Sequence, residues 1–180
     1  MKSSNISKQR IMAEAKKLRQ EKLSYLTAAP LEDDIYTWHF TFQGPENTDF
    51  HEGIYHGQIL LPYEYPFKPP DIVFMNKNGR FETNTKICLT ITQYHPEEWN
   101  SAWTIRTMLE AVVSLFAENI QGIGALTSSP DVRTFLAKNS HSFVCEKCGP
   151  IKDLLAPRPP IDSRPAITQK EEAGSGEEKL

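Results

Sequence analysis

Four of the thirteen prolines fall in one short stretch in the middle of the chain, Leu61-Pro-Tyr-Glu-Tyr-Pro-Phe-Lys-Pro-Pro70. Proline lacks a backbone N–H and fixes φ, so neither a helix nor a central strand can run through this stretch. The elements on either side must therefore be separate, and the stretch itself must be a loop.

Strands are predicted on both sides of the prolines. Residues 36–42 read Tyr-Thr-Trp-His-Phe-Thr-Phe, with aromatic side chains at every second position, which predicts a half-buried strand. Residues 53–61 form the next predicted strand, and residues 71–75 a short buried one. Together they indicate a meander of three or four antiparallel strands, and the predicted fold is taken as a four-stranded antiparallel meander.

Helices are predicted before and after these strands. In residues 7–22, Ile11, Ala15 and Leu18 share one face, with Ser4 or Ser7 as the cap. The other face is basic, with Glu14 and Glu21 among its charges, and is expected to be solvated.

Three helices are predicted after the strands. Thr104 caps an apolar stripe that ends at Phe116, and Ser129-Pro130-Asp131 begins a helix to about residue 139. A further short helix is expected over about residues 140–155. The chain is predicted to be α+β, with a long irregular segment over residues 76–103 that is typical of a functional loop.

Composition excludes several classes of protein. The formal charge of −3 gives no global attraction to nucleic acid, and three cysteines do not make a disulfide scaffold. No apolar run is long enough to cross a bilayer. We expect a flexible N-terminus over residues 1–6, one domain over 7–155, and a disordered Pro- and Glu-rich tail or linker over 156–180.

Two cysteine-bearing segments need interpretation. A lone cysteine such as Cys88 is most often a buried core residue. Cys88 instead lies in the long irregular segment. His95, seven residues later, could form a hydrolytic pair with it only if the loop folds back, so such a pair is not favoured. Cys145 and Cys148 have only His141 near them in sequence, so packing on a helix is favoured over metal binding or a redox role, and no metal site is predicted.

An ordered set of motifs resembles the ubiquitin-conjugating enzymes over about residues 7–155. The set comprises Tyr65-Pro-Phe-Lys-Pro-Pro70, Ile87-Cys-Leu-Thr-Ile91, Trp99 and the helix start at Thr104. Within the family, the J class is the most similar; its members are membrane-anchored enzymes of endoplasmic-reticulum-associated degradation. The residues that carry this likeness are Pro30-Leu-Glu-Asp33, Trp38-His-Phe40, Asn78-Gly-Arg-Phe81, Tyr94-His-Pro-Glu-Glu-Trp99 and His141-Ser-Phe-Val-Cys-Glu-Lys-Cys148.

The resemblance implies that Cys88 accepts ubiquitin from the activating enzyme as a thioester and passes it on to a lysine. It implies no bound cofactor, because ATP is used only by the upstream activating enzyme. At an ordinary thiol pKa near ~8.5, a few per cent of Cys88 is thiolate at neutral pH, enough for a good nucleophile. The alternative is a catalytically silent ubiquitin-binding module of the same fold.

The sequence departs from most of the family beside this cysteine. Arg80 stands where the usual His-Pro-Asn motif has its asparagine, as in the J class. We expect Asn78 to be the oxyanion donor, followed by Arg80 or a backbone N–H; alternatively, Asn78-Gly79 is simply a turn. The family usually has an acid just after the long helix, called the acidic gate, which helps to deprotonate an incoming lysine. That acid is missing near Gly122-Ile123-Gly124, with Glu118 the nearest acid, so serine and threonine hydroxyls are expected as further acceptors.

Partner contacts are implied in the same way. Phe67 and the segment Asn100-Ser101-Ala102 match the loops that bind RING-type ligases, the alternative being that Phe67 packs in the core. Arg10 lies near the contact for the activating enzyme. The resemblance places the full-length protein at the cytosolic face of the endoplasmic reticulum if it has the class's C-terminal anchor, which this sequence lacks, and otherwise in the cytoplasm.

Overall fold

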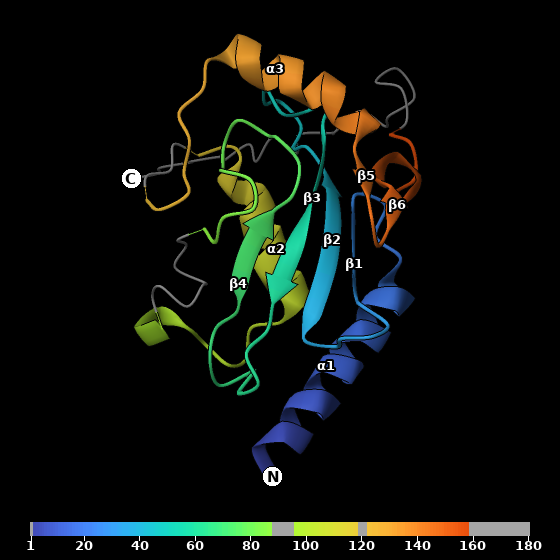
Figure 1. The fold of residues 1–180 in the computed structure, drawn as a ribbon, viewed down its shortest axis with the longest axis vertical. Helices are drawn as coiled ribbons and strands as arrows, with labels where there is room; N and C mark the ends of the chain where they lie inside the picture. Colours follow the sequence, from blue (N-terminus) through green and yellow to red (C-terminus); the bar gives the residue numbers. More distant parts are fainter. Residues whose placement is uncertain (1, 88–95, 119–121, 159–180) are drawn as a thin grey trace, which may run out of the picture.

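A four-stranded antiparallel sheet in the order β1-β2-β3-β4 organises the molecule (Figure 1). The computed structural model describes residues 2–87, 96–118 and 122–158, with side chains from residue 5 onward. The sheet strands are β1 (Leu26–Pro30), β2 (Thr37–Gln43), β3 (Ile54–Leu60) and β4 (Asp71–Phe74). The helices are α1 (Lys2–Glu21), α2 (Ile105–Leu115) and α3 (Pro130–Asn139). The predicted α+β class and meander are confirmed.

The main core lies between the sheet and α2. Phe40 and Phe42 of β2 point toward this side, and Phe116, just after α2, packs against the Phe42 ring with 5.3 Å between centroids. Thr104 caps α2 as predicted, its side chain accepting a hydrogen bond from the Thr107 N–H at 3.1 Å. The stripe of apolar residues on α2 is therefore the inner layer of the fold.

The opposite face of the sheet is also covered, which corrects the prediction for β2. Alternation predicted a half-buried strand, yet His39 and Thr41, which alternate with the aromatic residues, are only 6% and 1% exposed. A C-terminal segment packs on this outer face through Cys145 and Ile151, which cluster with Ile54 of β3. The polar half of the alternation therefore faces a second, small cluster and not water.

This C-terminal segment replaces the short helix predicted over residues 140–155. It consists of the 3₁₀ turn η2 (Ser140–Ser142), the two-residue strands β5 (Val144–Cys145) and β6 (Gly149–Pro150), and the 3₁₀ turn η3 (Ile151–Asp153). Gly149 has φ +78°, a left-handed conformation that suits glycine at the end of a tight turn. The Cys-x-x-Cys sequence therefore lies in a hairpin turn.

The last described residues bond to the turn between β2 and β3. The Gln43 side-chain amide donates to the Ala156 carbonyl at 2.8 Å, and Arg158 donates to the Gly44 carbonyl at 2.6 Å. Beyond residue 158 the predicted tail lies outside the described residues. Within the described part of the chain, no helix combines the length and the apolar character needed to cross a membrane.

Candidate functional site

The backbone that leads into Cys88 is fixed on the edge of the sheet. Ile87 is fully buried, and its N–H donates to the Ile72 carbonyl of β4 at 3.0 Å. Gly124, with φ +82°, passes so close that a Cβ there would lie 3.0 Å from Ile87 Cγ2. Cys88 itself lies outside the described residues, but the residue before it is anchored between β4 and the segment around Gly124.

The side chain of Asn78, the predicted oxyanion donor, closes a turn through hydrogen bonds to the neighbouring backbone. Its side-chain oxygen accepts hydrogen bonds from the N–H groups of Arg80 and Phe81 at 2.9 and 2.8 Å, and its amide donates to the Asn76 carbonyl at 3.1 Å. The side chain is fully buried. These contacts favour the alternative that Asn78 and Gly79 form a turn, and the oxyanion role stays a prediction.

Arg80 and Glu118 differ in where they point. Arg80 is buried, donates to the Phe116 carbonyl at 2.9 Å, and holds its guanidinium carbon 5.2 Å from the centre of the Phe50 ring. Among the described residues, the contacts of Arg80 are therefore those of a core residue. Glu118, the nearest acid to the expected gate, is exposed just after α2.

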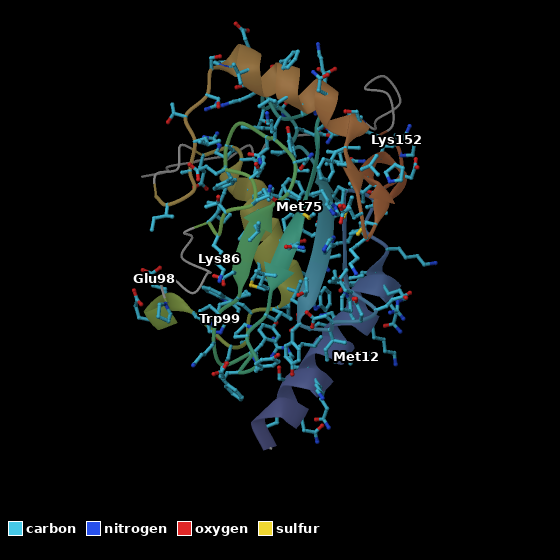
Figure 2. The ribbon with its side chains drawn as sticks, viewed as in Figure 1. Met12, Met75, Lys86, Glu98, Trp99 and Lys152 are labelled. Carbon is cyan, nitrogen blue, oxygen red and sulfur yellow. The ribbon has the colours of Figure 1, made fainter. Side chains whose placement is uncertain are left out.

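Phe67 is exposed, so the alternative that it packs in the core is wrong. Its side chain is 61% exposed, and Asn100, Ser101 and Ala102 are also exposed. The two loops are joined by Trp99, whose ring N–H donates to the Pro66 carbonyl at 2.7 Å. Figure 2 shows Trp99 toward the sheet and Glu98, of the 3₁₀ turn η1 (Pro96–Glu98), at the outer edge. The predicted ligase contacts thus form one surface.

Arg10 joins α1 to the same surface. Its guanidinium donates to the carbonyls of Ser101 at 3.1 Å and Trp103 at 2.9 Å. The residue predicted to contact the activating enzyme therefore supports the loop predicted to contact the ligase.

Glu14 is the residue that sequence reasoning missed at this end, since it is only 6% exposed and not on a solvated face. Its carboxylate accepts hydrogen bonds from the Tyr65 hydroxyl at 2.6 Å, the Arg10 Nε and the Ile105 N–H at 2.6 Å. Burial and the nearby Glu14 carboxylate raise the pKa of Tyr65, which keeps its hydroxyl as a donor. An acid beside Ala15 and three residues after Ile11, within the apolar stripe, was the available clue.

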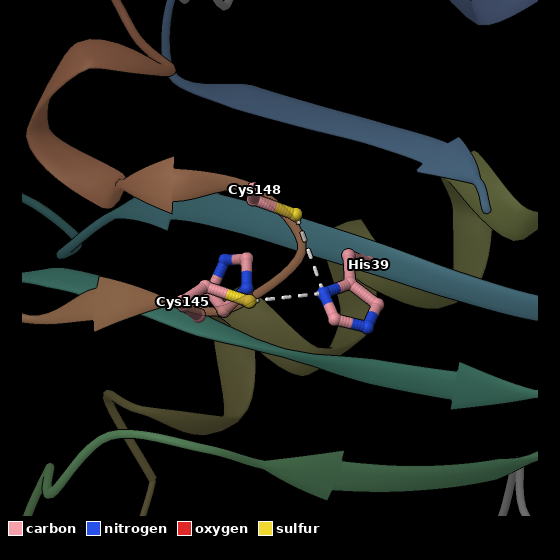
Figure 3. Close-up of side chains that lie close together, drawn as sticks. His39, Cys145 and Cys148 are labelled. Carbon is pink, nitrogen blue, oxygen red and sulfur yellow. Dashed lines mark hydrogen bonds between the residues drawn. The ribbon is translucent and has the colours of Figure 1, made fainter. Parts of the chain in front are cut away.

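The cysteine pair has different neighbours from those expected. His141 turns away and bonds to the Glu52 carbonyl at 2.7 Å. Cys145 and Cys148 instead place their sulfurs 3.4 and 3.3 Å from Nδ1 of His39 on β2, as Figure 3 shows. The expectation of a helix surface with His141 as the only neighbour is therefore wrong.

Comparisons with known proteins agree with the motif order. The family model described as "Ubiquitin-conjugating enzyme" matches residues 10–129. Ubiquitin-conjugating enzyme E2 J1 of Homo sapiens is 47% identical over 150 residues, covering 82% of this chain and 47% of the relative. Ubiquitin-conjugating enzyme E2 J2 of Homo sapiens is 38% identical over 135 residues, covering 75% and 52%.

A solved structure supports the same assignment. A crystal structure described as that of "a putative ubiquitin conjugating enzyme from Plasmodium yoelii" matches with a TM-score of 0.56 and 27% identity, over 63% of this chain and 74% of that one. The chain spans about half the length of the curated relatives it matches. From these matches and the fold, the chain belongs to the ubiquitin-conjugating enzyme family, and within it to the J class.

Proposed function

We propose that this protein accepts ubiquitin as a thioester on Cys88 and transfers it to an acceptor with the help of a RING-type ligase. One observation carries the proposal: the family match spans residues 10–129, and Cys88 is the only cysteine of the three within it. The anchored Ile87 supports it, because a covalent carrier must hold its thiol at a fixed point for two successive partners.

Two acyl transfers make up the proposed reaction. The Cys88 thiolate attacks the thioester carbonyl of the loaded activating enzyme, and that enzyme's thiolate leaves. An acceptor amine then attacks the new thioester, loses its proton to solvent or a base, and releases the Cys88 thiolate. Both steps pass through an oxyanion, which fixed hydrogen-bond donors stabilise.

A charging assay tests the carrier role. With activating enzyme, ubiquitin and ATP, the protein should form an adduct that survives non-reducing electrophoresis and disappears with thiol. Cys88→Ser should give a thiol-resistant oxyester, and Cys88→Ala should give none. A wild-type protein that binds ubiquitin without forming any adduct would establish the silent binding module instead.

The surface formed by Phe67 and Asn100-Ser101-Ala102 is proposed as the ligase contact. Its exposed aromatic lies in a loop that prolines and the Trp99 hydrogen bond hold in place, which lowers the entropy lost on binding. Phe67→Ala should reduce ligase-stimulated discharge about tenfold or more and leave charging unchanged, because large aromatic side chains dominate such contacts. Phe135→Ala is the matched control: Phe135 is 65% exposed on α3, away from this surface.

We propose that lysine is not the only acceptor, because the sequence from residue 119 to residue 130, where the gate is expected, contains no Asp or Glu. Free lysine and free serine should each discharge the thioester, with the serine product resistant to thiol and sensitive to hydroxylamine. Strict preference for lysine would refute the hydroxyl activity and leave the carrier role intact.

The J-class membership supports a role in endoplasmic-reticulum-associated degradation at the cytosolic face of that membrane. In cells, Cys88→Ser in the full-length protein should slow the turnover of a misfolded luminal substrate. The wild-type protein should sediment with microsomes, and its appearance only in the soluble fraction would contradict this location.

A further inference from the structure

Four side chains that suit a soft divalent metal ion meet on the outer face of the sheet. They are His39 of β2, His56 of β3, and Cys145 and Cys148 of the β5–β6 hairpin. One ligand atom from each lies within 4.8 Å of the others. Three of the residues are buried and Cys148 is half-buried. Two thiols and two imidazoles form the set that structural zinc prefers.

The measured distances fit a tetrahedral ion. His39 Nδ1 lies 3.4 Å from Cys145 Sγ and 3.3 Å from Cys148 Sγ (Figure 3). With Zn–S near 2.3 Å and Zn–N near 2.0 Å, the N···S edge of a tetrahedron is about 3.5 Å. No separation in the cluster exceeds 4.8 Å, so ligation needs a contraction of at most about 1.5 Å along any edge.

The hydrogen bonds within this cluster do not give each of its polar atoms a partner of its own. Both thiols converge on the one Nδ1 of His39, and Nε2 of His56 is buried with no hydrogen-bond partner among the described residues. A buried polar atom without a partner is unfavourable, because it has lost its hydrogen bonds to water and gained none in the fold. A bound cation would use the unpartnered Nε2 and both sulfurs together, so it satisfies every atom that the hydrogen bonds do not.

The remaining nitrogen of each ring is held by a neighbouring side chain. His56 Nδ1 is 2.8 Å from the Thr41 hydroxyl, and His39 Nε2 is 3.0 Å from the side-chain amide of Gln58, its cross-strand partner. The Thr41 hydroxyl can accept the ring proton of His56. The Gln58 amide presents its nitrogen to His39 Nε2, and a half-turn of this amide would present its oxygen, which can accept the His39 ring proton when Nδ1 binds an ion. Such partners orient metal-binding histidines and fix which nitrogen faces the ion.

Access and charge balance also suit an ion. A pocket of about 450 Å³ opens onto His39, His56 and Cys148, which gives a path from solvent. On binding, each thiol would lose its proton to solvent, and two thiolates would cancel the two charges of the ion. The site would then be neutral, so it needs no further charged group on a buried face.

We propose that His39, His56, Cys145 and Cys148 bind one Zn²⁺, which fastens the β5–β6 hairpin to the outer face of the sheet. This site is separate from the ubiquitin-transfer chemistry, and it replaces the sequence-based expectation of no metal. The hairpin has short strands, and the buried apolar cluster that joins it to the sheet is small: Cys145 of β5 and Ile151 of η3 pack with Ile54 of β3. A metal crosslink would therefore contribute much of its attachment.

Metal content tests the proposal directly. The full chain, with any affinity tag removed and purified without chelator, should contain about one zinc by elemental mass spectrometry. Cys145→Ser and Cys148→Ser should each weaken zinc binding by 100-fold or more in competition with a chromophoric chelator. Cys88→Ser and His141→Asn are matched controls that keep the full zinc content, whatever the outcome of the charging assay.

A second measurement uses the wild-type protein, so its outcome does not depend on whether a variant folds. Cobalt(II) chloride added to the metal-free wild-type protein should give the intense visible bands of a tetrahedral site with thiolate ligands. Thr41→Val should lower zinc affinity about tenfold and keep those bands, because it removes only the partner of His56. Absence of the bands together with zinc-free protein overturns the proposal, as does an intact mass 2 Da low from a Cys145–Cys148 disulfide.

Discussion

Two buried polar clusters lie at different places in this molecule, and they differ in how complete they are. Around Glu14, both carboxylate oxygens accept hydrogen bonds from groups of the chain itself, on α1, in the loop of residues 61–70 and at the start of α2. Around His39, the thiols share one nitrogen and His56 Nε2 has no partner among the described residues. The first cluster is self-sufficient, whereas the second is complete only with a ligand from outside.

The largest effect is expected in the self-sufficient cluster. Glu14→Ala removes the acceptor for three donors and should lower the free energy of unfolding by about 3 kcal/mol, because it strands buried polar groups. Urea denaturation with and without chelator measures this loss, which should be the same in both. Glu21→Ala is the control on the same helix: Glu21 pairs with the partly exposed Arg106 at 2.8 Å and should cost under about 1 kcal/mol.

The next effect distinguishes the second cluster from the first. Free zinc at 100 times its dissociation constant should raise the free energy of unfolding by about 2.7 kcal/mol. At the same zinc concentration the gain should fall to about 0.4 kcal/mol or less in Cys148→Ser, because its affinity is expected to be at least 100-fold weaker. The gain should persist in Glu14→Ala, because distant sites contribute independently. Loss of the zinc gain in Glu14→Ala would show that the two clusters are coupled and would break the comparison.

The smallest effect tests how evenly the Glu14 cluster shares its hydrogen bonds. Tyr65→Phe removes one donor and leaves Arg10 and Ile105, so it should cost about 1 kcal/mol in urea denaturation. Tyr63→Phe, in the same loop and 74% exposed, should change the free energy of unfolding by less than about 0.5 kcal/mol. A Tyr65→Phe cost as large as that of Glu14→Ala would show that this one hydroxyl dominates the cluster.

Local chemistry explains which parts of the fold could be predicted. Thr104 and Ser129 cap their helices through contacts three residues away, and the apolar stripe of α2 needs only its own spacing. Each of these features is decided within a few residues of sequence.

The remaining features depend on contacts between distant segments. The cysteines at 145 and 148 are more than a hundred residues from His39, so sequence spacing paired them only with His141. The same distance hid the burial of the polar face of β2, because its cover comes from the end of the domain. A clue did exist: His39 and His56 are histidines on adjacent predicted strands, and a Cys-x-x-Cys-Gly turn follows later.

The bonds from Ala156 and Arg158 to the β2–β3 turn have a mechanical consequence. A pulling force applied to the chain after residue 158 enters the domain at Gln43 and Gly44, before it reaches the hairpin. The hairpin and its proposed metal are thereby relieved of tension. A tether attached downstream would load the sheet at its turn and leave the outer-face crosslink undisturbed.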